Sequence, residues 1–263
     1  MKKGRGKFIV ILIILVTVLF FYPLRSYLIM SIYSHSHKKD SIFEKYMIDV
    51  NVKGGFSTLI TDYYPFIMYF NDSVGFSRFS GIDCDMSIIY NFGAFTFPFI
   101  SSSLFNEKSP YFSTFYGAYA VKPNDDNRRF GFDGDDLNVS EAVLVPKFDL
   151  TELVLFDLGC ENISFDYSID DIKKNDNGFY VIDATITTNS MSHRYEGFKR
   201  NYLQYGRPFL WIQPEESFKV TDYHGRIYAS YIEKDNITLF YYIITQDMAA
   251  LEECDEHFLS EIQ

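Results

Sequence analysis

The chain has 263 residues, of which 47% are hydrophobic and 19% aromatic, and its formal net charge is −11. It is therefore long and apolar enough to bury a core, which excludes a chain that is mostly disordered. Residues 1–33 contain five basic and no acidic residues, so residues 34–263 have a net charge of −16. A body this acidic repels phosphate backbones, which argues against nucleic acid as a partner.

The N-terminal residues predict a membrane anchor. MKKGRGK precedes an uncharged apolar run from Phe8 to Leu24. As a helix this run would rise roughly 26 Å, close to the roughly 30 Å thickness of the hydrocarbon core. The basic residues before it favour a cytoplasmic N-terminus. A cleaved signal peptide would end in small residues, but no alanine occurs before Ala94. We therefore expect an uncleaved signal-anchor, a single transmembrane helix within residues 1–33.

Three regions follow from this pattern. Residues 1–33 form the cytoplasmic tip and the anchor, and the polar residues 34–40 form a short stalk. After the stalk there is no linker, repeat or low-complexity block. One extracytoplasmic β-rich domain over residues 41–263 is therefore the most economical organisation.

Aromatic and β-branched runs bounded by turn residues predict strands in the first half of this domain. These runs are residues 56–70, 86–97 and 111–121. Residues 148–159, FDLTELVLFDLG, predict a short helix with Asp149 as its N-cap and Gly159 at its end. A strand remains the alternative for so short a run.

The second half of the domain predicts a hairpin, a meander and a terminal helix. Asn177-Gly178 is a favoured turn between strands over residues 163–174 and 179–188. The meander, residues 217–244, has turn signals at residues 222–225 and 235–236. The terminal helix has apolar residues on one face: Met248, Leu251, Cys254, Phe258 and Ile262. The predicted class is α+β, predominantly antiparallel β with a C-terminal amphipathic helix.

Residues 124–136, NDDNRRFGFDGDD, are the most acidic stretch. Their candidate metal ligands for calcium are Asp125, Asp133, Asp135 and Asp136. The EF-hand pattern fails because position five counted from Asp125 is Arg129. The two arginines can pair with the aspartates, and Asn, Asp and Gly are typical of surface turns. We interpret the stretch as a solvated loop, with an irregular calcium site or a catalytic role as alternatives.

Candidate catalytic acids are Asp83, Asp85 and Asp133. Alternation in a strand would place Asp83 and Asp85 on one face and Cys84 on the other. A glycan hydrolase needs two carboxylates roughly 5–9.5 Å apart, which the sequence alone does not establish. No G-x-S-x-G, H-E-x-x-H or glycine-rich phosphate loop occurs.

The three cysteines allow at most one disulfide, and Cys84 with Cys160 is the pair that we favour. No C-x-x-C spacing supports a zinc site.

The sequence as a whole favours a membrane-anchored domain that acts by binding, in an accessory or immunity-type role, with a protein partner and without a cofactor. The alternatives are an envelope glycan hydrolase that uses paired carboxylates and a calcium-dependent binding module.

Overall fold

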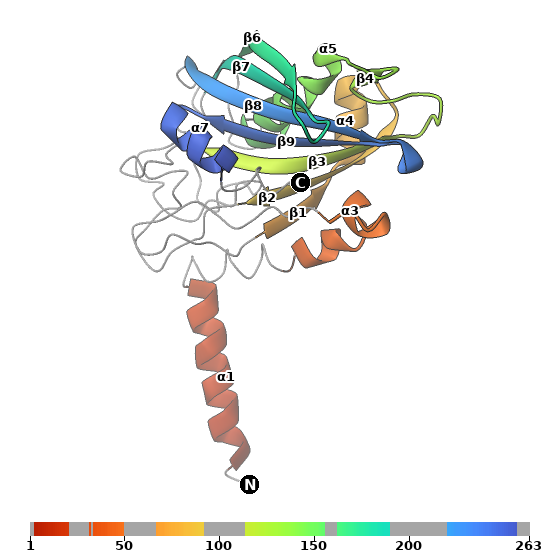
Figure 1. Ribbon diagram of the computed structural model, residues 1–263. Coiled ribbons are helices and arrows are strands. Elements are labelled where there is room, and N and C mark those ends of the chain that lie inside the picture. Colours follow the sequence, from red (N-terminus) through yellow and green to blue (C-terminus); the bar gives the residue numbers. More distant parts are fainter. Residues whose placement is uncertain are drawn as a thin grey trace.

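The computed structural model describes residues 3–20, 32, 34–49, 67–91, 114–155, 162–189 and 220–256, and every structural statement below concerns these residues. A seven-stranded sheet has helices on both faces, and helix α1 projects from one end of the domain (Figure 1). All of the described strand pairings are antiparallel. The predicted α+β class with a mainly antiparallel sheet is confirmed.

The strand order in the sheet is β1-β2-β3-β9-β8-β7-β6. The bounds of these strands are β1 Ile67–Asn71, β2 Cys84–Asn91, β3 Phe115–Pro123, β6 Phe165–Lys174, β7 Tyr180–Asn189, β8 Val220–Ile232 and β9 Ile237–Thr245. A separate two-stranded ribbon pairs β4 (Phe132–Asp133) with β5 (Asp136–Leu137).

Helices cover both faces of the sheet. One face carries α4 (Ser73–Ser80), α5 (Val139–Ala142), α6 (Leu144–Phe148) and the π-helix η2 (Asp149–Leu155). The other face carries α3 (Ile42–Lys45) and α7 (Met248–Cys254). Helix α1 spans Lys3–Phe20, and the short 3-10 helix η3 spans Glu233–Asp235.

Strand β9 lies at the centre of the sheet and is buried along its whole length. Its side chains alternate between two hydrophobic cores, because successive residues of a strand point to opposite faces. Phe240 and Tyr242 join the core under α4 and η2, whereas Tyr241 and Ile243 join the core under α3 and α7. Burial on both faces explains why its sequence is a continuous apolar run.

The predicted hairpin is confirmed: β6 and β7 pair across a turn in which Gly178 has a φ of 84°. The predicted turn at residues 222–225 is wrong, because β8 runs straight through it. Gly225 serves close packing there, since a Cβ would lie 2.8 Å from the Cδ1 atom of Ile186. The turn at residues 235–236 is present, and Asn236 has a φ of 53°.

The helix predicted for residues 148–159 begins earlier and differs in type. Asp149 is not an N-cap, because α6 runs directly into η2 at this residue. Its carboxylate is buried and accepts a hydrogen bond of 2.5 Å from the hydroxyl of Tyr242. The partner on β9 is distant in sequence, so a local capping pattern could not reveal it. Gly159 lies outside the described residues.

The C-terminal helix α7 is shorter than predicted. Leu251 is buried as expected, but Met248 is 45% exposed, so the apolar face does not begin there. Ala250 takes part in the buried contact instead. Phe258 and Ile262 lie outside the described residues.

Residues 34–38 are helical and lie against the edge strand β1. The Ser34 hydroxyl accepts a hydrogen bond from the Tyr69 amide at 3.0 Å, and the His37 carbonyl accepts one from the Asn71 side chain at 2.8 Å. The His37 ring also stacks on Phe70. The segment expected to be a stalk is thus in contact with the sheet.

Within the described part of the chain, no helix combines the length and apolar content needed to cross a membrane. Helix α1 includes three basic residues near its start. The residues from Phe8 to Val16 are apolar and between 45% and 67% exposed.

Candidate functional site

The acidic stretch forms a loop whose polar groups bond to one another. Arg129 donates hydrogen bonds to the Gly134 carbonyl at 2.8 Å and to Asp135 at 3.1 Å. Its guanidinium also lies 4.7 Å from the centre of the Tyr231 ring. Asp125 accepts a hydrogen bond from the Asn127 amide at 2.9 Å, as a residue at the start of a turn does.

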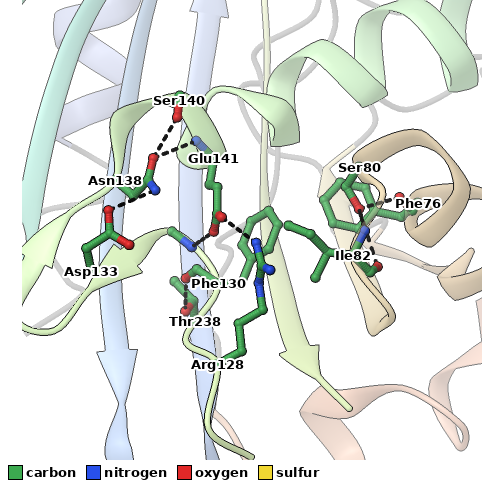
Figure 2. Close-up of polar contacts among 11 residues, drawn as sticks. Phe76, Ser80, Ile82, Arg128, Phe130, Asp133, Asn138, Ser140, Glu141 and Thr238 are labelled. Atoms are coloured by element: carbon green, nitrogen blue, oxygen red, sulfur yellow. Dashed lines mark hydrogen bonds and ion pairs between the residues drawn. The ribbon is translucent and has the colours of Figure 1, made fainter. Parts of the chain in front are cut away.

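Glu141 holds the loop to the start of α5 (Figure 2). One carboxylate oxygen accepts a hydrogen bond from Arg128 at 2.7 Å, and the other accepts one from the Gly131 amide at 2.8 Å. Asn138 caps α5 through the Glu141 amide and donates to Asp133 at 3.0 Å. These bonds give most of the loop's charged groups a local partner.

The same loop sends aromatic residues into the core. Phe130 and Phe132 are buried, and the Phe130 carbonyl accepts a hydrogen bond of 2.6 Å from the Thr238 hydroxyl on β9. Phe130 packs edge-on against Phe240 and against Phe76 of α4. The loop therefore closes one end of the core.

The three candidate catalytic acids are all exposed, and Asp83 and Asp85 flank the buried Cys84 as strand alternation predicts. Asp83 is exposed and accepts a hydrogen bond from Asn124 at 2.9 Å. Asp85 is exposed and lies opposite Lys122 on β3. Asp133 belongs to the separate ribbon, where it lies opposite Asp136. Among the described residues, no group of three or more His, Cys, Asp or Glu is arranged to hold a metal ion.

Cys84, between the two aspartates, is a buried free thiol that is 1% exposed. Burial raises the pKa of this thiol to about 11, and the Ser77 hydroxyl opposes this in part. Cys160, its favoured disulfide partner in the sequence, lies outside the described residues.

A cavity of about 510 Å³ opens between α4 and η2, within the roughly 300–1,000 Å³ range of small-ligand sites. Its apolar wall contains Phe70, Phe79, Phe148 and Leu153. Phe148 packs on Phe79, with ring centres 5.3 Å apart, and on Phe76 behind the wall, at 5.1 Å. These contacts pack the Phe148 ring between two other aromatic rings.

Three charged residues, Asp72, Arg78 and Glu152, line the same cavity. Asp72 caps α4 by accepting a hydrogen bond from the Gly75 amide at 2.9 Å. A Cβ on Gly75 would lie 2.3 Å from the Asp72 carboxylate, so the glycine makes room for this cap. Arg78 and Glu152 are exposed and form no ion pair with the described residues.

The η2 segment supplies Glu152 and Leu153 to the cavity. π-Helical turns are rare and occur frequently at functional sites. The wider turn changes the angular spacing of side chains, so this wall of the cavity differs from one built on an α-helix.

A second charged cluster surrounds Arg226 on β8, whose side chain is 11% exposed. Its guanidinium donates to Asp183 at 2.6 Å, to Asp255 at 2.6 Å and to Glu252 at 3.1 Å. The Tyr228 hydroxyl donates to the other oxygen of Asp255. Burial raises the pKa of Tyr228, and the neighbouring Asp255 raises it further. The cluster joins α7 to β7 and β8.

Sequence reasoning missed both the cavity and the Arg226 cluster. The cluster left a signal, because Asp183 and Arg226 are opposite charges within two predicted strands and lie directly opposite each other in the register. The cavity had no comparable signal in the sequence, because its residues come from separate parts of the chain: β1, α4, α6 and η2.

Comparisons with protein-family models, with curated proteins and with solved structures found no match to this chain.

Proposed function

We propose that this protein is anchored in a membrane by one N-terminal helix and that its domain, outside the cytoplasm, acts by binding. An accessory or immunity-type role fits this arrangement. The single observation that carries the proposal is helix α1, in which the residues from Phe8 to Val16 are apolar and exposed.

An aqueous environment is unfavourable for such a helix. Full burial of one large aliphatic side chain contributes about 1.5–3 kcal/mol, so transfer of the whole run into lipid is strongly favourable. The run continues without charge in the sequence to Leu24, which brings it to spanning length. The basic residues before Phe8 favour a cytoplasmic N-terminus.

Binding rather than catalysis is supported by the surroundings of the charged groups. The candidate acids Asp83, Asp85 and Asp133 are all exposed, whereas a glycan hydrolase needs at least one poorly solvated acid. The cavity between α4 and η2 instead combines a packed aromatic wall with exposed charges, as binding sites do.

An arginine placed in the apolar run tests the anchor. Leu12 lies near the basic end of the run, where an arginine can reach the interface, so the variant to test is Val16→Arg at the centre of the run Phe8–Leu24. An arginine at the centre of a membrane helix costs about 2.5–3.5 kcal/mol on insertion scales, so we expect Val16→Arg to lose resistance to alkaline carbonate extraction. Val16→Leu is the matched control and should remain in the membrane fraction. Protease protection in sealed cells or vesicles reports the side on which the domain lies.

Two results would contradict the proposal. One is extraction of the unaltered protein by carbonate to the same degree as Val16→Arg. The other is a mature N-terminus located after residue 33, because the anchor would then have been removed.

A further inference from the structure

We propose that the cavity between α4 and η2 binds a small zwitterion with an apolar middle, the size of a dipeptide. This inference rests on the proposed binding role and names the chemical class of the ligand.

The apolar wall selects the middle of the ligand. Phe70 and Phe79 are partly exposed and present aromatic rings to the cavity, and the buried Phe148 supports them from behind through its contacts with Phe79 and Phe76. A wall of rings packed in this way loses little conformational freedom when a ligand binds, so burial of an aliphatic side chain against it gives net affinity.

The charges select the two ends of the ligand. Arg78 offers a planar guanidinium that matches a carboxylate, and Glu152 offers an acceptor for an ammonium group. Asp72 adds a second negative charge on the side of the α4 N-terminus. Arg78 and Glu152 line the same cavity without pairing with each other. A ligand of one charge would pair with one of them only, whereas a zwitterion pairs with both.

The size of the cavity agrees with a dipeptide. A cube of about 510 Å³ has an edge of about 8 Å. Two residues in an extended chain span about 7 Å, so the ammonium and carboxylate of a dipeptide lie at opposite ends of such a space.

Calorimetric titration of the full-length protein in detergent micelles with the dipeptide Leu-Leu tests the inference. We expect saturable binding with a Kd of about 0.1–1 mM, typical of a ligand this small. Leu-Leu amide and N-acetyl-Leu-Leu each lack one charge, and each should bind at least about tenfold more weakly.

Two variants assign the charges to their partners. Arg78→Gln should weaken Leu-Leu binding about tenfold and leave binding of the amide unchanged, because the amide has no carboxylate to lose. Glu152→Gln should weaken Leu-Leu binding and leave binding of the N-acetyl form unchanged. Both residues are exposed, so neither change should affect folding, which circular dichroism checks. Lys234→Gln and Asp126→Asn are exposed charge controls away from the cavity and should bind like the unaltered protein.

Absence of saturable heat up to about 10 mM Leu-Leu, well above the expected Kd, overturns the inference. Equal affinity for the free and blocked dipeptides, or equal effects of Arg78→Gln and Lys234→Gln, overturns it as well. None of these results bears on the proposed membrane anchor, which carbonate extraction and protease protection test independently. Failure of the anchor is recognised separately, by the comparison of Val16→Arg with the unaltered protein.

Discussion

Arg226→Gln removes the cation that Asp183, Glu252 and Asp255 share, and leaves Asp183 with the exposed Lys173 at 3.8 Å. Asp183 on β7, together with Glu252 and Asp255 near the C-terminus, would then face one another without a guanidinium between them. Glutamine can replace one hydrogen bond but not the charge. The variant therefore separates the electrostatic contribution of the cluster from the space that its side chain fills.

The expected cost follows from the burial of each partner. Breaking a buried ion pair by removing one member costs about 3–5 kcal/mol. Here Arg226 is 11% exposed, but Glu252 is 58% exposed and is largely screened by water. We therefore expect the lower end of the range, about 3 kcal/mol of unfolding free energy. For a domain of this size that is a fall in Tm of about 6–12 °C.

The same loss should appear at pH 7 and at pH 9. Burial alone would lower the pKa of Arg226, but its hydrogen bonds to Asp183 and Glu252 and the charge of Asp255 outweigh burial and raise it. A raised pKa contributes stability that is complete at every pH below the ordinary arginine value and is lost only above it. The variant, which lacks the group, should therefore fall below the unaltered protein by a constant amount across this interval.

Calorimetric or fluorescence-detected unfolding of the full chain in micelles measures the fall in Tm, and hydrogen exchange at α7 locates it. Arg78→Gln is the matched control, because Arg78 is exposed and forms no ion pair within the part of the chain that the structure describes, and its Tm should not change. A fall of less than about 2 °C for Arg226→Gln, or an equal fall for both variants, would refute the reasoning.

Two further predictions concern Cys84 and the acidic loop. Because burial raises the pKa of the Cys84 thiol to about 11, iodoacetamide at pH 8 should label it only after unfolding, and rapid labelling of the folded protein would show that the site is open. The thiol ionises at a lower pH in the unfolded chain than in the folded protein, so ionisation favours unfolding. The free energy of unfolding should therefore fall as pH rises from 9 towards 11. Calcium at about 10 mM should leave Tm unchanged, whereas a site with a Kd near 1 mM would raise it by about 3–6 °C. A saturable rise that disappears in Asp133→Asn would restore the calcium-dependent alternative.

Patterns of short range account for the parts of the fold that the sequence predicted. Asn177-Gly178 determined the β6–β7 hairpin because the turn and both strands lie within one segment. Gly225 misled because glycine is typical both of turns and of close packing in a strand, and only the position of Ile186 distinguishes them. Asp149 misled for a related reason, since its partner Tyr242 lies on a distant strand.

The candidate site was harder to predict than the fold. The aspartates at residues 124–136 were candidate metal ligands because so many lie close together in the sequence. In the structure they belong to a loop in which Arg129 bonds to the Gly134 carbonyl and to Asp135. Arg78 and Glu152 line the cavity but look like ordinary surface charges in the sequence. They line the same cavity because α4 and η2 pack on the same face of the sheet.

The central position of β9 has a consequence for the order in which the chain can fold. In the sheet, β9 lies between two groups of described strands, β1 to β3 and β6 to β8, and pairs with both. It is also the last of the described strands to leave the ribosome. Until it arrives, β3 and β8 each have an open edge, to which a second chain can add. The pairing of β3 with β9 joins residues more than 100 positions apart, and contacts this distant in sequence form slowly. A chain that ends before β9 would therefore lack the strand that connects β3 to β8 in the sheet. Chaperones should accordingly bind the nascent domain until a late stage of its synthesis.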